Sequence, residues 1–293
     1  MNSKIYSIII TYNPDFESLR NLINILVKQT YKVIICNNSL DDIIDLHDND
    51  KAKIHIINFG QNLGIAKAQS IGMKWAFDDG AEFILQMDQD STPADNMVEE
   101  LFTCYNNVVA MGFNPGLIGA QDYDKYTKEI NKARLKKGKA IKSYKSYKVV
   151  DSTLSSGSLI PKNSYEVIGG MRDDLFIDAV DHEYCWRLRY AGFCIIRNCN
   201  ALLAHRLGDG RYEILKVISV GMPNPFRHYY ATRNIFLLLK EKHVPFYWKF
   251  SSIIKLFLKI IFYPIFLPKG FDRLKFFLKG VYDGFAGRRG ILK

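Results

Sequence analysis

The sequence has 293 residues, of which 48% are hydrophobic and 24% charged, and it contains neither an internal repeat nor a low-complexity tract. This composition excludes disordered and fibrous proteins and allows one large or two small folded domains. Five cysteines without a C-x-x-C pair, and a first apolar run too short for a signal peptide, argue against a secreted, disulfide-linked protein. We therefore predict a cytoplasmic protein.

The net charge of +10 is unevenly distributed along the chain. Residues 211–293 contain 16 lysines and arginines but only 4 aspartates and glutamates, whereas residues 1–210 are close to neutral. A basic region of this kind is typical of proteins that bind nucleic acid, an anionic membrane or an acidic substrate. The charge alone leaves these partners open.

Apolar strands alternate with amphipathic helices in the first third of the chain. We predict strands at residues 6–13, 32–38, 53–59 and 82–87. We predict helices after the capping residue Asp15, over residues 62–77, and over residues 93–102 with Pro93 in the first turn. This alternation predicts a parallel sheet covered on both faces, in which ligands bind at the carboxyl ends of the strands. The polar residues that follow the strands should gather at that edge: Thr11-Tyr12-Asn13, Asn37-Asn38-Ser39 and Asp88-Gln89-Asp90.

The middle of the chain begins with a polar stretch and returns to strand and helix patterns. Residues 122–148 are rich in charged residues and tyrosine, and we predict a mobile surface loop there. Residues 149–161 predict a strand interrupted by small residues. A helix is predicted over residues 176–192, ended by Gly192, and residues 194–205 predict an apolar strand that ends in a histidine.

The basic C-terminal region has a helical pattern from residue 222 onward. Residues 246–270 are apolar and aromatic, but their longest run without a charge has nine residues and contains Pro264. A membrane-spanning helix needs about 20 apolar residues. Lysines at 249, 255 and 259 suit helices that lie in the interface of an anionic membrane. A buried helix whose lysines extend to the surface is the alternative.

The stretch L-Q-M-D-Q-D-S, residues 85–91, ends a predicted strand with two carboxylates one residue apart. Carboxylate oxygens in this position suit Mg²⁺ or Mn²⁺, which commonly bridge to phosphate groups of a substrate. A solvated loop or a helix cap explains Asp88 and Asp90 equally well. Asp181 and Glu183 are likewise compatible with ion pairs on a helix surface, and His205 with a buried structural histidine.

Seven short motifs occur in an order and spacing that together are specific. They are S-I-I-I-T-Y-N (7–13), N-L-G-I-A-K-A (62–68), Q-M-D-Q-D-S (86–91), S-G-S-L-I (156–160), F-I-D-A-V-D-H-E-Y-C-W-R (176–187), H-R-L-G (205–208) and R-H-Y-Y-A-T-R-N (227–234). From Ile8 to about Asn234 the chain resembles family 2 glycosyltransferases, in particular the rhamnosyltransferase-like branch that builds bacterial surface polysaccharides. The resemblance implies the GT-A fold, an α/β, Rossmann-like mixed sheet flanked by helices.

We predict two regions of the chain. By the resemblance, residues 1–210 would form the catalytic domain, with a nucleotide-sugar half at about 1–120 and an acceptor half at about 149–210. The charge and the aromatic residues of the C-terminal region, rather than the resemblance, predict that residues 211–293 form a helical, amphipathic region that associates with a membrane.

The resemblance also assigns roles to individual residues. Asp90 would hold a divalent metal ion together with Asp88, which would also lie near the ribose of the donor. His205 would be a further metal ligand, and Asp181 the general base that accepts the proton of the acceptor hydroxyl. The implied nucleotide-sugar contacts are Thr11, Tyr12, Asn13, Asn37, Asn38, Asn62, Gln89 and Arg233, and the implied acceptor contacts are Trp186 and Glu183. Cys36 departs from the pattern, because the family usually has an aspartate there that recognises the base.

The resemblance predicts a metal-dependent, inverting transfer of L-rhamnose from dTDP-L-rhamnose to a lipid-linked glycan of the O-antigen or capsule type. The enzyme would use Mg²⁺ or Mn²⁺ and lie on the inner face of the bacterial cell membrane, with its oligomeric state open. Donors such as UDP-glucose, UDP-galactose or UDP-galactofuranose are the alternative. A remote alternative, suggested by the basic C-terminal region, is a non-enzymatic protein that binds nucleic acid.

Overall fold

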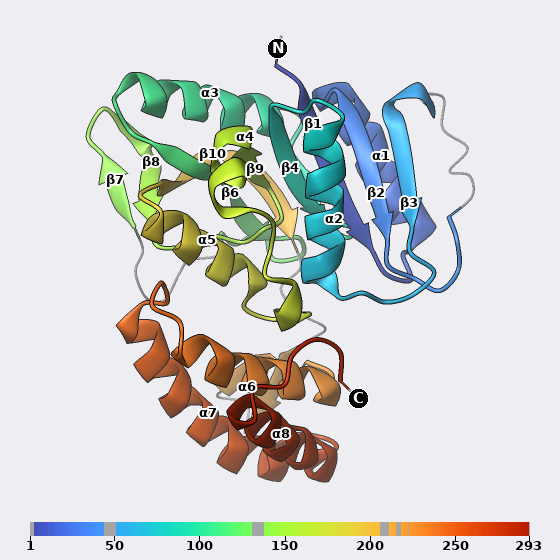
Figure 1. The fold of residues 1–293 in the computed structure, drawn as a ribbon, viewed down its shortest axis with the longest axis vertical. Helices are drawn as coiled ribbons and strands as arrows, with labels where there is room; N and C mark the ends of the chain where they lie inside the picture. The colour runs from blue at the N-terminus through green and yellow to red at the C-terminus, as the bar shows by residue number, and fades with distance from the viewer. Residues whose placement is uncertain are drawn as a thin grey trace.

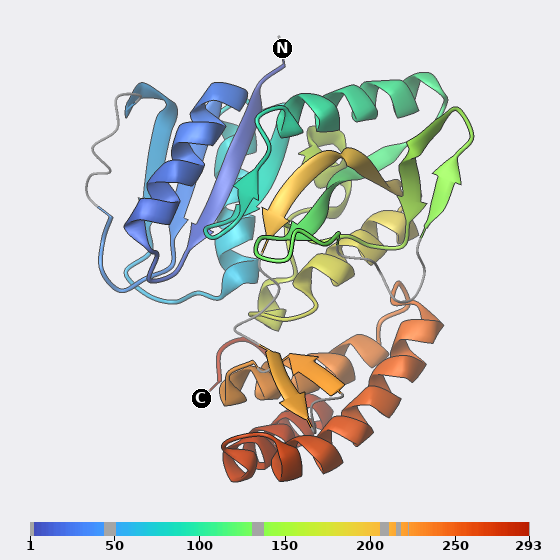
Figure 2. The same cartoon turned by 180° about the vertical axis from the view of Figure 1, so that it is seen from behind.

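A computed structural model describes residues 3–43, 51–130, 138–205, 211–214, 218–221 and 223–292. Its larger part is an α/β body built on one sheet, and three C-terminal helices form a layer beside it (Figure 1). These helices are α6 (Pro225–Leu239), α7 (Phe246–Phe266) and α8 (Gly270–Phe285). A separate two-stranded sheet, β11 (Arg211–Ile214) with β12 (Ile218–Gly221), lies over this layer in the view from behind (Figure 2).

The predicted parallel strands are present and adjacent in the sheet. They are β1 (Ile5–Thr11), β2 (Lys32–Asn37), β3 (Ile54–Asn58) and β4 (Phe83–Asp88). β1 pairs in parallel with both β2 and β4, and β2 pairs in parallel with β3. All seven residues of β1 are buried, which explains why this strand reads as a continuous apolar run.

The other half of the sheet makes it mixed rather than parallel throughout. Among the described residues the strand order is β3-β2-β1-β4-β9-β6-β10-β8-β7, and β5 pairs with β10. β9 is antiparallel to both β4 and β6, whereas β6 and β10 are parallel. The strands of this half are β5 (Thr92–Pro93), β6 (Pro115–Asp124), β7 (Lys139–Ile141), β8 (Tyr144–Val150), β9 (Ser158–Pro161) and β10 (Cys194–His205).

Helices cover both faces of the sheet and enclose a core on each side. The helices of the body are α1 (Phe16–Gln29), α2 (Ile65–Asp78), α3 (Met97–Ala110), α4 (Lys162–Ile168) and α5 (Val180–Tyr190). α1 and α3 pack on one face, and α2 and α5 pack on the other. The Asp15 carboxylate caps α1 by accepting from the Ser18 amide at 3.0 Å, and Gly192, with φ of +90°, follows the end of α5 as predicted.

The prediction of a surface loop over residues 122–148 was wrong for much of this range. β6 continues to Asp124, and β7 and β8 form an antiparallel pair at the edge of the sheet. Ile141 and Tyr147 are buried in the core, whereas Lys142 lies in the turn between β7 and β8, and Lys145 of β8 is exposed. Residues 131–137 of the predicted loop lie outside the described part of the chain.

Two predicted helix starts were also wrong. The helix expected from Pro93 begins at Met97, because Thr92 and Pro93 instead form the short strand β5 against β10. The helix expected from residue 176 begins at Val180, because the residues before it adopt a sequence of turns. Asp181 consequently lies in the first turn of α5.

The helices of the C-terminal layer are held together by buried polar contacts. Arg273 of α8 is 2.6 Å from His228 of α6, and burial followed by the Arg273 charge lowers the pKa of His228 to about 3. Tyr229 donates a hydrogen bond to buried Asp283 at 2.8 Å. No helix in the described ranges combines the length and apolar character required to cross a bilayer.

Candidate active site at the carboxyl edge of the sheet

The polar ends of β1, β2 and β4 meet at one edge of the sheet, as predicted from the sequence. The Tyr12 amide donates to Gln89 Oε1 at 2.7 Å, and the Asn13 amide donates to Ser39 Oγ at 2.8 Å. Thr11 donates to Asn37 Oδ1 at 3.2 Å. Hydrogen bonds therefore join the ends of these strands into one continuous surface.

The asparagine side chains at this edge of the sheet mainly form hydrogen bonds to neighbouring segments of the same edge. Asn38 Oδ1 accepts from the Leu63 amide at 2.7 Å, and Asn38 Nδ2 donates to Asn62 Oδ1 at 3.0 Å. These bonds attach the N-L-G segment before α2 to the end of β2. Thr11, Asn37 and Asn38 are buried, whereas Tyr12 is 51% exposed, so Tyr12 is better placed for a ligand.

Cys36, which stands where the family usually has an aspartate, is fully buried on β2. Burial raises the pKa of its thiol to about 12, so the side chain remains neutral. Its sulfur lies against Gly72 of α2, where an added Cβ would be only 2.8 Å away. Cys36 is therefore a packing residue between the strand and the helix.

Asp88, Asp90 and His205 converge on one point. Each offers a ligand atom, and these atoms all lie within 4.8 Å of one another. The pKa of the Asp88 carboxyl is raised to about 6, chiefly by burial; His205 opposes this shift, while Asp90 and Asp181 add to it. Two carboxylates and an imidazole are a donor set that fits Mg²⁺ or Mn²⁺.

A chain of hydroxyl groups fixes the orientation of His205. Ser91 Oγ is 2.8 Å from His205 Nδ1 and 3.0 Å from Ser156 Oγ. Ser156 Oγ in turn accepts from the Asp88 amide at 3.0 Å. Because Nδ1 is engaged with Ser91, Nε2 is the ring nitrogen left to face a cation.

Replacing Ser91 by alanine should lower the affinity for Mn²⁺ by about 10- to 100-fold, because His205 would lose the group that orients its ring. Titration of Mn²⁺ into the protein, followed by electron paramagnetic resonance, measures this affinity directly. Ser164→Ala is the matched control, since Ser164 is equally buried but bonds to carbonyl groups beside α4. Equal Mn²⁺ affinity of Ser91→Ala and the wild type would show that the hydroxyl chain does not support the site.

The affinity for Mn²⁺ should also fall at low pH. The raised pKa of Asp88 means that its carboxyl holds a proton below about pH 6, and a cation must displace this proton. Affinity should thus be constant above pH 7 and fall roughly tenfold per pH unit below about 6. Calorimetric titration of Mn²⁺ at pH values above 7 and below about 6 measures this affinity. Equal affinity for Mn²⁺ at high and low pH would contradict the prediction.

Asp181 lies in the same cleft as the Asp88–Asp90–His205 cluster. The cleft has a volume of about 680 Å³ and is lined by all four of these residues. Asp181 Oδ1 accepts from the His182 amide at 2.8 Å, and the amino end of α5 favours its negative charge. The cleft therefore brings together a candidate cation site and a carboxylate that can accept a proton.

Of the residues assigned from the sequence, only Asp88, Asp90, Asp181 and His205 line this cleft, and three of the others are buried in the protein. Glu183 is fully buried and pairs with Arg187 at 2.9 Å and with His243 at 3.0 Å. Trp186 is 1% exposed and packs behind the cleft wall. Arg233 is fully buried in α6, where it donates to main-chain carbonyl groups. Their positions do not agree with direct contact to a nucleotide sugar or an acceptor.

The wall of the cleft also contains residues that sequence reasoning missed. His182 follows Asp181 directly, and its ring lies 5.8 Å from that of Trp186. Trp248 of α7 packs edge-on against Trp186, with the ring centroids 5.0 Å apart. α6 contributes Ala231 and Ile235. His182 could have been found from its position beside Asp181, but no local pattern in the sequence marks Trp248 as a cleft residue.

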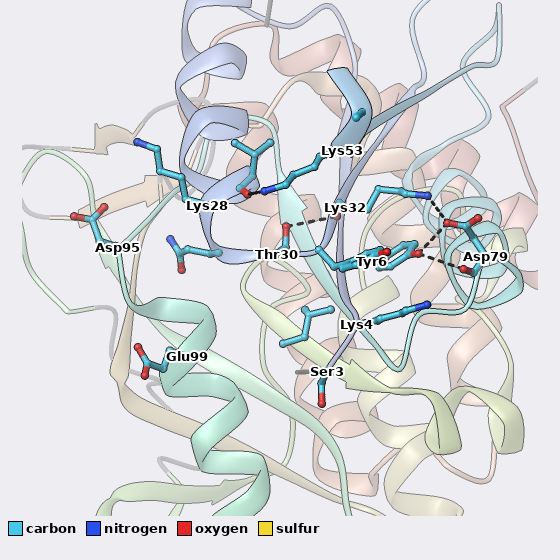
Figure 3. Close-up of a pocket in the computed structure, with 15 residues that line it drawn as sticks. Ser3, Lys4, Tyr6, Lys28, Thr30, Lys32, Lys53, Asp79, Asp95 and Glu99 are labelled. Atoms are coloured by element: carbon cyan, nitrogen blue, oxygen red, sulfur yellow. Dashed lines mark hydrogen bonds and ion pairs between the residues drawn. The ribbon is translucent and has the colours of Figure 1, made fainter. Parts of the chain in front are cut away.

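Another hollow, of about 990 Å³, lies at the opposite edge of the sheet (Figure 3). Some of its polar groups pair with one another: Asp79 accepts from Tyr6 at 2.9 Å and from Lys32 at 2.5 Å. Lys53 donates to the Val27 carbonyl at 3.1 Å. This hollow lies at the amino ends of β1 and β2, whereas ligands of such sheets bind at the carboxyl ends.

Comparison with known proteins identifies the family of the chain. Residues 7–153 match the family described as Glycosyl transferase family 2. The chain is 31% identical over 294 residues to the dTDP-rhamnosyl transferase RfbF of Shigella flexneri, covering 99% of this chain and 97% of the relative.

Solved structures with low sequence identity share the fold. The crystal structure of S. aureus TarS 1-349 has a TM-score of 0.56 at 15% identity and covers 95% of this chain and 81% of its own. The same protein in complex with UDP has a TM-score of 0.60 at 12% identity, covering 97% and 92%. From the sequence match and the shared GT-A fold, we conclude that the chain belongs to glycosyl transferase family 2 and is a glycosyltransferase.

Proposed function

We propose that this enzyme transfers L-rhamnose from dTDP-L-rhamnose to a hydroxyl group of a lipid-linked glycan, with inversion at the anomeric carbon. The observation that carries the proposal is the single cleft shared by Asp181 and the Asp88–Asp90–His205 cluster. The identity of the donor is supported by the name of the Shigella relative, which is similar along nearly its whole length.

Asp181 would act as the general base. A sugar hydroxyl is a poor nucleophile, and a carboxylate that accepts its proton during attack makes the reaction feasible near neutral pH. A single displacement of this kind inverts the anomeric carbon and needs no covalent intermediate with the enzyme.

Mg²⁺ or Mn²⁺ would be held by Asp90, His205 and Asp88. The bound ion would neutralise the negative charge on the departing diphosphate. Tyr12 and Asn13 would contact the nucleotide from the exposed side of the edge. Asn37, Asn38 and Asn62 would support them by keeping the edge in shape.

A panel of donors tests the identity of the sugar. With Mg²⁺ or Mn²⁺ present, transfer from dTDP-L-rhamnose should be faster than transfer from UDP-glucose, UDP-galactose or UDP-galactofuranose. A UDP-sugar used in preference would replace the proposed donor while leaving the assignment of Asp181 intact. The hypothesis of a non-enzymatic nucleic-acid-binding protein is set aside by the membership of family 2.

The acceptor is proposed to be lipid-linked because α7 and α8 carry an apolar surface beside positive charges. Phe246, Phe250, Phe257 and Ile265 recur at helical spacing on α7 and are between 63% and 81% exposed. Phe271 of α8 is 82% exposed. Aromatic residues beside exposed lysines suit a helix that lies in the headgroup region of an anionic membrane.

Reversing two charges on α7 should weaken membrane binding. The double change Lys255→Glu and Lys259→Glu should lower the affinity for anionic vesicles by about tenfold or more, since each lysine near such a surface contributes about 1 kcal/mol. Flotation with vesicles of neutral and anionic lipid measures the binding. Lys67→Glu with Lys162→Glu is the matched control on the α/β body, and an equal loss in both double variants would contradict a surface specific to α7.

A further inference from the structure

The buried Asn234 of α6 is attached to the segment that leads into α5. Its Nδ2 donates to three main-chain carbonyl groups: Leu175 at 3.1 Å, Ile177 at 2.7 Å and Asp178 at 2.9 Å. Asn234 has no exposed surface. One side chain of the C-terminal layer therefore fixes the course of the backbone just before Asp181.

Arg233 completes this attachment. Its Nη2 donates to the Leu175 carbonyl at 2.8 Å and to Asn234 Oδ1 at 2.9 Å, and its Nη1 donates to the Gly290 carbonyl. The guanidinium also lies over the ring of Tyr230, 5.0 Å from its centroid. Arg233 thus orients the Asn234 amide and binds the same segment.

The attached segment has a strained backbone. Phe176, Asp178 and Ala179 have φ angles of +65°, +69° and +65°, a region that residues other than glycine rarely adopt. Such conformations persist only where the surroundings hold them. Ala179 is the residue immediately before α5, so its backbone angles set the direction in which the first turn, with Asp181, begins.

The same segment packs against the start of α2, on the nucleotide side of the cleft. The Phe176 carbonyl accepts from the Ala66 amide at 3.3 Å. The Phe176 ring occupies the space beside Gly64 so closely that an added Cβ would lie 2.5 Å from it. A shift of the segment would therefore move Asp181 relative to the edge that carries Asn62.

We propose that Arg233 and Asn234 form a clamp that positions the general base, so that α6 is part of the catalytic unit although neither side chain lines the cleft. The clamp holds the strained segment 174–179 and thereby sets the place of Asp181 relative to Asp88 and Asp90. This inference rests on the role proposed for Asp181.

The test compares Asn234→Ala and Arg233→Lys with Asn198→Ala. Asn198 is an equally buried asparagine whose Nδ2 donates to the Glu100 carbonyl at 2.9 Å, on the far side of the sheet. Both clamp variants should lower kcat by about 100-fold, because a displacement of the base by about 1 Å has that effect. Their affinity for dTDP with Mn²⁺ should be unchanged, and Asn198→Ala should lose thermal stability without losing kcat.

Amide hydrogen exchange separates this inference from the proposed function. Asn234→Ala should speed amide exchange at residues 175–182, and Asn198→Ala should not. This result is expected even if the wild-type enzyme transfers none of the sugars in the donor panel, because it does not depend on the identity of the donor. Arg233→Lys provides the same readouts if Asn234→Ala does not fold. The proposal is overturned if the clamp variants keep wild-type kcat, if kcat falls equally in Asn198→Ala, or if exchange at residues 175–182 does not change.

Discussion

Replacing Asp181 by asparagine should reduce kcat for sugar transfer by about 10²- to 10⁴-fold, the contribution typical of a positioned general base. Asparagine has nearly the same size and can still accept from the His182 amide, but it cannot take a proton from the acceptor hydroxyl. The affinity for the nucleotide donor should remain close to that of the wild type, because Asp181 is assigned to the acceptor side of the cleft.

This prediction is measured by steady-state transfer at saturating donor and acceptor, together with calorimetric binding of dTDP. Glu166→Gln is the control, since Glu166 is an exposed carboxylate on α4, outside the cleft. Transfer by Asp181→Asn at a rate near that of the wild type would remove Asp181 as the base. Loss of dTDP binding in the same variant would instead indicate that the substitution disturbs the donor side.

Replacing Asp90 by alanine should weaken metal-dependent binding of the donor by about 100-fold or more. Loss of a group that merely supports a metal ligand already costs about 10- to 100-fold in affinity, and Asp90 is assigned as a ligand itself. Asp90 is exposed, so its removal should leave the free energy of unfolding nearly unchanged. The loss should therefore appear in binding and activity rather than in folding.

Titration of dTDP with and without Mn²⁺ measures this effect. In the wild type, Mn²⁺ should increase the affinity strongly, and in Asp90→Ala the two titrations should nearly coincide. Asp95→Ala is the control, since Asp95 is an exposed carboxylate before α3. Equal enhancement by Mn²⁺ in Asp90→Ala and the wild type would contradict the assignment of the metal ligand.

Sequence reasoning predicted that the candidate cation ligands Asp88 and Asp90 lie at one edge of the sheet, because their position follows from a general property of α/β sheets. The apolar runs of β1, β2 and β4 identify parallel buried strands, and the polar residues at their ends must then meet at one edge. Asp88 and Asp90 could be placed on this basis alone. His205 is distant in the sequence and needed the resemblance to the family.

Sequence reasoning failed where the neighbours of a residue decide its role. From the sequence, Arg233 was expected to bind the phosphate groups of the donor. In the structure its guanidinium group instead donates hydrogen bonds to the carbonyl groups of Asp174 and Leu175. The ion pair of Glu183 with Arg187 agrees with the predicted pairing on α5, but the complete burial of Glu183 beside His243 could not be read from the sequence. The positive φ angles before α5 leave no mark in the sequence, because no glycine stands at 176, 178 or 179.

The C-terminal region illustrates the same limit. Its lysines and aromatic residues predicted a surface helix, and the exposed phenylalanines of α7 are compatible with that prediction. Trp248 of the same helix nevertheless turns toward the α/β body and lines the cleft. One face of α7 packs toward the α/β body and the other is exposed, and both carry apolar residues. The sequence of α7 is therefore apolar almost all round, and it does not show which face packs inward.

Proton nuclear magnetic resonance of the product tests the central claim most directly. Wild-type enzyme incubated with dTDP-L-rhamnose, a glycan acceptor and Mg²⁺ should yield a new glycosidic linkage whose anomeric configuration is opposite to that of the donor. Such a product agrees with a single displacement assisted by Asp181. A product that retains the configuration of the donor would contradict the account, because retention requires a different set of roles in the cleft.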